Sequence, residues 1–272
     1  MQYPASATKA LTNYESRVLA KAQERFAELL DPGAAAPEVD ADGPLLLLCM
    51  TPRSGSSALS AALARSKALG LGGERLSNKP NGPLQKTLAQ TPCATMRQAL
   101  DWVITDSRTK NGVAQIKCDF QQIYPFIADP ACLDRLQGAT WVYLTREDVL
   151  GQAISRYRGF KTGMWHDNKK DAATFTDAAY DYDEIRKQVA FLSDMMGAFE
   201  RTFAAIGVTP LRITYEQLTE DDTGTMHRIA DRMGIEIETP VSLKDSGHKK
   251  VASSNNDALR AQFLADFKAA LG

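Results

Sequence analysis

LLLLCMTPRSGSSALSAALARSKALGLGG, residues 45–73, is the stretch that decides the fold. It opens with an apolar run that is long enough for one buried strand and too short to cross a membrane. After the turn TPRSGSS at 51–57, apolar residues return at helical spacing. A strand, a turn and a helix in this order bring backbone N–H groups and a helix N-terminus together around an anion. The sequence therefore predicts a site for a phosphate or sulfate group.

Side chains of the turn strengthen this prediction. Arg53 adds a permanent positive charge and a planar set of donors, and the serines add hydroxyls. The turn differs from the phosphate loop G-x-x-x-x-G-K-[ST] of nucleotide triphosphatases, because no lysine follows Gly55. A Cys-x5-Arg phosphatase loop also fails, since Cys49 stands too close to Arg53. An ordinary strand–helix turn that binds nothing remains the alternative.

Composition favours a soluble protein of one domain. The 272 residues can bury a substantial core, and 44% apolar with 24% charged residues is ordinary for a globular chain. A net charge of −1 gives no reason to expect a nucleic-acid partner. The four cysteines lack metal-type C-x2-C spacing, and neither a secretory signal nor a membrane-length apolar run is visible. We expect a cytoplasmic protein with no integral membrane segment and no metal site.

Short apolar strands alternate with helical patterns along the rest of the chain. This alternation predicts an α/β fold of three layers, with a mainly parallel central sheet flanked by helices. We expect a single domain over 1–272, with an N-terminal helix and linker at 1–43 and a polar loop and C-terminal helix at 241–272. Beyond 45–50, the expected strands are 112–117, 141–146 and 211–215. The expected helices are 7–30, 95–108, 148–161, 182–207, 224–233 and 257–271.

Basic residues stand at the ends of three of these strands. Arg53 follows the first, Lys117 ends the second and Arg146 ends the third. In parallel sheets, ligands bind beyond the carboxyl ends of the strands, where these three side chains would meet. Their agreement supports a shared anion site.

A second motif begins at Arg146. Ser155 lies nine positions later on the following helix, and the two side chains could hold a second phosphate, separate from the first. In the alternative interpretation Arg146 only pairs with Glu147 or Asp148, and Ser155 is a neutral helix residue.

Together the two motifs resemble those of sulfotransferases that use 3′-phosphoadenosine-5′-phosphosulfate (PAPS), and more closely those of the bacterial trehalose 2-sulfotransferase family. The loop resembles x-P-R-S-G-S-T-L-L, and the later helix resembles R-x-D-x-x-x-Q-A-x-S-x-x-R-A-x-x-T-x-x-W. The matching residues of that helix are Arg146, Asp148, Gln152, Ala153, Ser155, Arg158, Thr162 and Trp165. AQIKCDF and LRITYEQL resemble two strands of the family, so that the resemblance covers residues 45–220.

The resemblance implies a sulfotransferase fold with a P-loop-like strand–loop–helix, and PAPS as co-substrate without a metal. It implies that Arg146 and Ser155 grip the 3′-phosphate. Because relatives form dimers, it also implies a homodimer, with the N-terminal helix as a candidate contact. The loop residues that would grip the 5′-phosphosulfate are Arg53, Ser54, Gly55, Ser56 and Ser57.

The family's proposed base is a glutamate some twenty residues beyond the loop arginine, and the count from Arg53 falls on Glu74. By this resemblance Glu74 takes the proton of the acceptor hydroxyl, a role worth about 10²–10⁴-fold in rate. Arg53 and Lys117 would stabilise charge on the leaving phosphate and the sulfate. Alternatively, Glu74 is a loop acid that pairs with Arg75 or Lys79.

Departures from the family concern the acceptor more than the chemistry. Gly72 stands where the family often has proline, and Arg75-Leu76 replaces its aromatic pair. Ser-Ser-Asn-Asn at 253–256 replaces an S-x-x-W pattern. The expected acceptor is a hydroxyl of a carbohydrate-like or other small polar molecule, and His166 could line its site. The basic residues Lys244, Lys249 and Lys250 could close over the donor or could be solvated.

Two other functions stay open from the sequence. A divergent kinase-like phosphotransferase would also use a phosphate-binding loop, although the missing lysine argues against it. A non-catalytic nucleotide-binding or scaffold protein could keep the same fold without the reaction.

Overall fold

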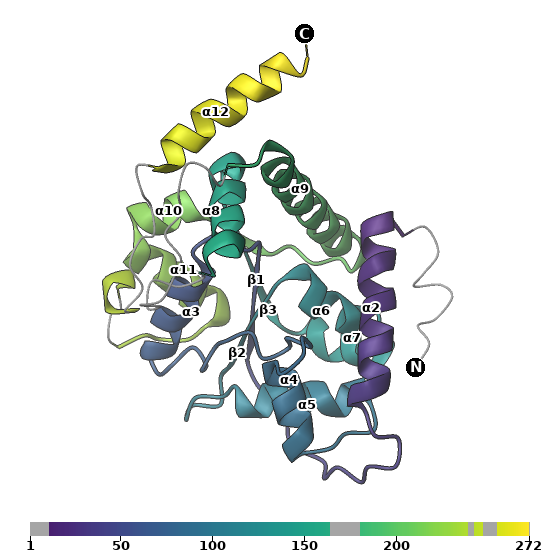
Figure 1. Cartoon of the computed structure of the whole chain (residues 1–272). Helices are drawn as coiled ribbons and strands as arrows, with labels where there is room; N and C mark the ends of the chain where they lie inside the picture. The colour runs from purple at the N-terminus through teal and green to yellow at the C-terminus, as the bar shows by residue number, and fades with distance from the viewer. Residues whose placement is uncertain (1–10, 164–179, 239–241, 247–254, 272) are drawn as a thin grey trace.

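Four parallel strands form the central sheet of the protein, in the order β2-β1-β3-β4. The computed structural model describes residues 11–163, 180–238, 242–246 and 255–271 (Figure 1). The strands are β1 (Leu45–Met50), β2 (Ala114–Cys118), β3 (Thr140–Thr145) and β4 (Leu211–Thr214). All four predicted strands are therefore confirmed, close to their expected bounds.

The side chains of β1 point alternately into two separate cores, and every residue of the strand is buried. One core lies under the face that carries Leu45, Leu47 and Cys49, and the other lies under Leu46 and Leu48. A strand buried on both faces needs an unbroken apolar run, which explains the sequence LLLLCM. The prediction of three layers is confirmed.

Helices cover both faces of the sheet (Figure 1). The helices of the larger core are α2 (Asn13–Leu29), α4 (Pro83–Gln90), α5 (Met96–Asp106), α6 (Phe120–Ile127), α7 (Pro130–Gln137) and α9 (Tyr182–Ala205). Those of the smaller core are α3 (Ser56–Arg65), α10 (Tyr215–Glu220) and α11 (Asp222–Met233).

The N-terminal helix begins later than the periodicity predicts. Thr12 caps α2, because its hydroxyl accepts from the Glu15 N–H while the Glu15 carboxylate accepts from the Thr12 N–H at 2.8 Å. Such a reciprocal cap marks the N-terminal end of a helix, so α2 begins directly after Thr12. The remainder of the predicted start, 7–10, lies outside the described residues.

Several short elements escaped prediction. The eight-residue helices α6 and α7 fill the connection between β2 and β3, and α6 contains Pro125. A proline within so short a segment argues against a helix when only the sequence is known. Also unpredicted were α10, which replaces the end of the last expected strand, and the 3₁₀ turn η2 (Leu243–Ser246).

A third, smaller core joins α8 (Val149–Thr162) and α9 to the C-terminal helix α12 (Asn255–Ala269). Leu259 and Phe263 of α12 pack there against Tyr157 and Ile154. In Figure 1, α12 extends away from the rest of the molecule toward the C-terminus. None of the helices in the described ranges is long and apolar enough to span a lipid bilayer.

Candidate active site

The turn after β1 has the backbone of an anion-binding loop. Arg53 and Gly55 both adopt positive φ, +70° and +83°. Left-handed residues in such turns allow neighbouring N–H groups to converge on an anion. Gly55 is the N-cap of α3 and supplies no side-chain hydrogen bond to the first turn. The N–H groups of that turn are therefore available to a ligand, at the end of the helix whose dipole favours negative charge.

Replacement of Gly55 by alanine is expected to lower the free energy of unfolding by about 2–4 kcal/mol. The positive φ disfavours any Cβ, and a Cβ built at Gly55 would lie 2.8 Å from Cδ2 of Tyr215. Urea unfolding measures the loss. Gly234→Ala is the matched control, because Gly234 has φ +67° but open space around it. Equal losses in the two variants would show that the close approach of the new Cβ to Tyr215 does not contribute to the loss of stability.

The α8 helix holds this loop in place. Nε of Arg53 donates to Oγ of Ser155 at 3.1 Å, which links the two sequence motifs directly. Nε2 of Gln152 donates to Oγ1 of Thr51 at 2.8 Å and to the carbonyl of Pro52 at 2.7 Å. The residues of the two phosphate sites that the sequence predicts as separate are therefore in contact through Arg53 and Ser155.

Three guanidinium groups gather beside the loop. Burial lowers the pKa of Arg53, and the positive charges of Arg146 and Arg158 lower it further. Like charges held together in a partly buried position raise the free energy of the unliganded protein. An anion bound among these groups would relieve the repulsion.

Arg146 also has partners within the protein. Its Nη2 lies 3.4 Å from Oδ2 of Asp148, its Nε lies 3.9 Å from Oε1 of Glu216, and its Cζ lies 5.0 Å from the centre of the Tyr215 ring. Of the two acidic partners expected for Arg146, the structure shows Asp148 beside it. The carboxylate of Glu147 instead accepts from the hydroxyl of Thr214.

The C-terminal helix is attached to the same region. Nη2 of Arg260 donates to both carboxylate oxygens of Asp148, at 2.7 and 2.6 Å, while Asp148 caps α8. Nη1 of Arg158 donates to Oδ1 of Asn256 at 2.7 Å. Side chains of α12 therefore contact Arg158, a member of the guanidinium cluster, and Asp148, which lies beside Arg146.

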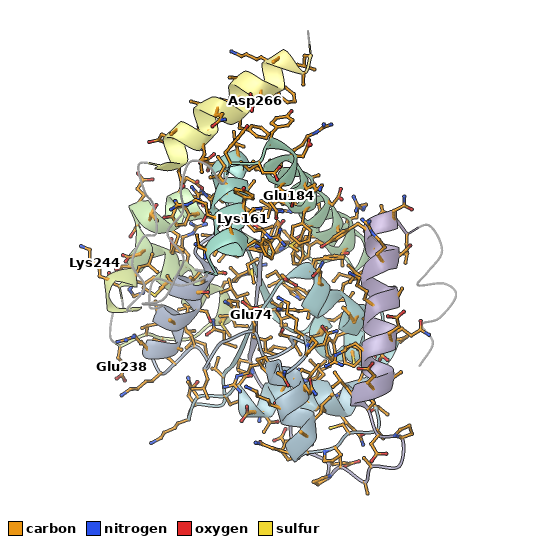
Figure 2. The ribbon with its side chains drawn as sticks, in the orientation of Figure 1. Glu74, Lys161, Glu184, Glu238, Lys244 and Asp266 are labelled. Atoms are coloured by element: carbon orange, nitrogen blue, oxygen red, sulfur yellow. The ribbon has the colours of Figure 1, made fainter. Side chains whose placement is uncertain are left out.

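Glu74 and Lys117 form an ion pair at the carboxyl end of β2. Nζ of Lys117 lies 2.9 Å from Oε1 of Glu74 and donates to Oγ of Ser57 at 2.9 Å. Figure 2 shows Glu74 near the centre of the fold, beside the sheet. Glu74 does not pair with Arg75, which instead forms an ion pair with Asp106. Sequence spacing alone could not have revealed the contact between Glu74 and Lys117.

The Glu74 carboxylate is ionised at neutral pH. Burial by itself would raise its pKa, but the charge of Lys117 and hydrogen bonds from Gln122 and Lys117 hold the pKa below the ordinary value. Glu74 is thus able to accept a proton, and Lys117 remains beside it as a cation.

A cavity of about 340 Å³ lies between the Arg53 loop and Glu74. It lies at the ends of β1 and β2 and is bordered by residues of α6, α8 and α9. The residues that line it are Met50, Pro52, Arg53, Ser56, Ser57, Glu74, Lys79, Asp119, Gln121, Arg156, Phe160 and Phe191. The predicted loop arginine, two of its serines and the predicted base therefore face one space.

Part of the lining was missed by sequence reasoning. Asp119 comes directly after β2 and Gln121 lies in the first turn of α6, positions that could have marked them as ligand-facing. Arg156, Phe160 and Phe191 carry no comparable signal. The Cζ atom of Arg156 lies 3.9 Å from the ring centre of Phe191 and 4.8 Å from that of Phe160.

Asp119 is a buried carboxylate with an unusual affinity for protons. Burial and then the negative charge of Glu74 raise its pKa from 3.8 to about 6. Because the folded state binds this proton more tightly, the contribution of Asp119 to the free energy of unfolding falls as the pH rises from about 4 to about 6 and stays lower above it.

Asp119→Asn is expected to remove this pH-dependent loss, because asparagine also caps helices but carries no charge. Above pH 6 the variant should be more stable than the wild type by about 1–3 kcal/mol, and near pH 4 the two should agree. Urea unfolding at both pH values measures the difference. A difference that does not change with pH would contradict the assigned proton affinity.

Other predicted residues do not line the cavity, or lie outside the residues that the structure describes. Ser54 is fully buried, and no hydrogen-bond partner for its hydroxyl is found among the described residues. Lys244 is exposed, and Figure 2 shows it at the edge of the molecule, away from Glu74. Trp165, His166, Lys249 and Lys250 lie outside the described residues.

Comparison with known proteins identifies the family. Residues 46–264 match the family model described as Stf0 sulphotransferase. The fold is similar to the crystal structure of a sulfotransferase from Alicyclobacillus acidocaldarius, with a TM-score of 0.49 and 12% identity over 83% of this chain and 93% of that chain. A search of curated proteins gave no match. Because the family model spans most of the sequence, the chain belongs to the Stf0 sulphotransferase family and is a transferase enzyme.

Proposed function

We propose that this enzyme transfers a sulfuryl group from PAPS to a hydroxyl of a carbohydrate-like or other small polar acceptor. One observation carries the proposal: the Arg53 loop and the Glu74 carboxylate line the same cavity. The anion-binding loop would bind the phosphosulfate of PAPS, and the ionised carboxylate would accept the proton of the acceptor hydroxyl. The catalytic residues are Glu74, Arg53 and Lys117.

The donor would lie across the loop and the guanidinium cluster. We assign its 5′-phosphosulfate to Arg53, to the N–H groups of the loop at 54–57 and to the hydroxyls of Ser56 and Ser57. The 3′-phosphate is assigned to Arg146 and Ser155, and Arg158 adds charge nearby. The Arg53–Ser155 contact of 3.1 Å supports this arrangement, because one donor molecule has to reach both phosphate positions.

The acceptor would occupy the part of the cavity beyond Glu74. Besides the loop residues and Glu74, the cavity is lined by aromatic rings of Phe160 and Phe191 and by polar groups of Asp119, Gln121 and Arg156, which we assign to the acceptor. Small-molecule sites combine apolar walls with a few placed polar groups in this way. The volume of about 340 Å³ is that of the whole cavity, including the space beside the Arg53 loop.

The reaction breaks the bond between sulfur and the 5′-phosphate oxygen and forms one between sulfur and the acceptor oxygen. Glu74 takes the proton that the acceptor hydroxyl releases. Arg53, Lys117 and the loop N–H groups stabilise the negative charge that develops on the leaving phosphate, so that the products are the sulfated acceptor and 3′,5′-adenosine bisphosphate (PAP). As in phosphoryl transfer, positioning and electrostatic stabilisation supply most of the rate.

Calorimetric titration with PAP tests the proposal. We expect a Kd in the micromolar range and much weaker binding of 5′-AMP, because the latter lacks the 3′-phosphate. Absence of PAP binding at millimolar concentration would overturn the proposal. Transfer of phosphate from Mg–ATP would favour the phosphotransferase, and PAP binding without turnover of PAPS on a broad panel of hydroxyl compounds would favour the non-catalytic alternative.

A cytoplasmic location and a homodimer belong to the same proposal. The described cysteines Cys49, Cys93, Cys118 and Cys132 are free thiols, which supports a reducing compartment. Sedimentation equilibrium measures the mass in solution and decides between monomer and dimer.

A further inference from the structure

Gln122, a buried residue in the first turn of α6, links this helix to Glu74. Asp119 is the N-cap of α6, and its carboxylate accepts from the Gln122 N–H at 3.0 Å. The side chain of Gln122 returns to the Asp119 N–H, whose distance to Oε1 is 3.2 Å. The other end of the same amide, Nε2, donates to Oε2 of Glu74 at 2.9 Å.

We propose that Gln122 is a positioning residue for Glu74, and that the cap of α6 fixes its amide in the orientation that donates to this carboxylate. The inference rests on the proposed function, in which Glu74 is the base. Gln122 is outside the set of residues that line the cavity, so that it acts through Glu74.

The orientation of the amide follows from its two neighbours. A backbone N–H can only donate, so the Gln122 atom that faces the Asp119 N–H must be the oxygen. The carboxylate of Glu74 can only accept, so the atom that faces it must be the nitrogen. A flipped amide would place two donors together and two acceptors together. Gln122 is 4% exposed, which keeps water from compensating for such a mismatch.

Glu74 is thereby held at both oxygens. Oε1 contacts Lys117 and Oε2 contacts Gln122, each at 2.9 Å. Two such contacts oppose rotation of the carboxylate, and a carboxylate has enough lone pairs to accept a further proton. The hydrogen bond from Gln122 also favours the ionised form, in which Glu74 can act as a base.

The residue type at position 122 is informative. A reciprocal helix cap accepts either glutamate or glutamine at the third position, because both provide an oxygen for the N-cap N–H. Only glutamine also provides a donor. Glutamate at 122 would preserve the cap but would place a second carboxylate against Glu74, next to the buried Asp119.

Gln122→Glu separates positioning from helix capping. The matched control is Gln98→Glu in α5, where Gln98 forms the same cap with Thr95 outside the cavity. Glutamate side chains labelled with ¹³C at the carboxyl carbon are titrated by NMR in the PAP-bound protein, and Glu74→Gln identifies the signal of Glu74. This readout needs no acceptor.

We expect the proton affinity of Glu74 to rise at least tenfold in Gln122→Glu and to stay unchanged in Gln98→Glu. With an acceptor from the panel, the acidic limb of kcat/KM moves to higher pH while PAP affinity is kept. Gln122→Met removes the hydrogen-bond donor without adding charge. It should raise the proton affinity of Glu74 too, but by a smaller factor. It replaces Gln122→Glu if that variant does not fold.

A Glu74 titration in the Gln122 variants that matches the wild type would overturn the inference. If Glu74→Gln abolishes transfer while the Gln122 variants titrate like the wild type, the proposed function stands and the positioning role fails. If Glu74→Gln retains full transfer, Glu74 is not the base and the positioning role fails with it, while transfer of the sulfuryl group itself stands.

Discussion

Exchange of Glu74 for glutamine is expected to lower kcat by about 10²–10⁴-fold, with little change in the Kd for PAP. The amide cannot take the proton of the acceptor hydroxyl. It still fills the space beside Lys117 and can accept a hydrogen bond from it, so that the donor end of the cavity is preserved. Steady-state kinetics with labelled PAPS and calorimetry with PAP measure the two quantities.

Glu184→Gln is the control for loss of one carboxylate. Glu184 lies in the first turn of α9 and pairs with Lys187, and Figure 2 shows it well away from Glu74. Wild-type turnover in Glu74→Gln would mean that another group accepts the proton. A parallel loss of turnover and of PAP affinity would mean that Glu74 mainly keeps Lys117 in place.

Arg146→Ala is expected to weaken PAP binding by about 10–150-fold, the range for loss of a hydrogen bond to a charged group. Binding of 5′-AMP should change by less than about threefold, because this nucleotide has no 3′-phosphate. Asp148 keeps its contacts with Arg260 in the variant, so the N-terminus of α8 stays capped. Calorimetry with both nucleotides at one salt concentration measures the ratio.

Arg146→Lys provides the matched comparison. It retains the charge but loses the planar donor set, and we expect an intermediate Kd for PAP. Equal losses for PAP and 5′-AMP in Arg146→Ala would indicate a general electrostatic effect. Unchanged affinity for both would show that Arg146 serves only Asp148, Glu216 and Tyr215.

The parts of the fold that could be predicted are those that depend on local sequence patterns. Leu45–Met50 is a buried strand because each of its residues is apolar, and Gly55 marks a turn because the chain there needs a positive φ. The helices α6 and α7 could not be predicted, since each is short and Pro125 interrupts the first pattern. Tertiary packing, rather than propensity, stabilises such helices.

The candidate site follows the same division. Arg53 and Lys117 could be placed at strand ends from the sequence. The contact between Arg53 and Ser155 could not, because it depends on how α8 packs across the end of β1. Nor could the environment of Asp119, whose raised pKa results from burial and from Glu74, a residue of a different segment.

The central place of β1 in the sheet has a consequence for biosynthesis. Both of its neighbours, β2 and β3, lie far downstream in the chain. At roughly 5–20 residues per second, the ribosome completes β1 several seconds before either partner exists. During that time an uncharged, wholly apolar segment is without its sheet, which is the composition most prone to intermolecular β-pairing. Lower temperature and chaperone capture during expression should therefore raise the yield of native enzyme.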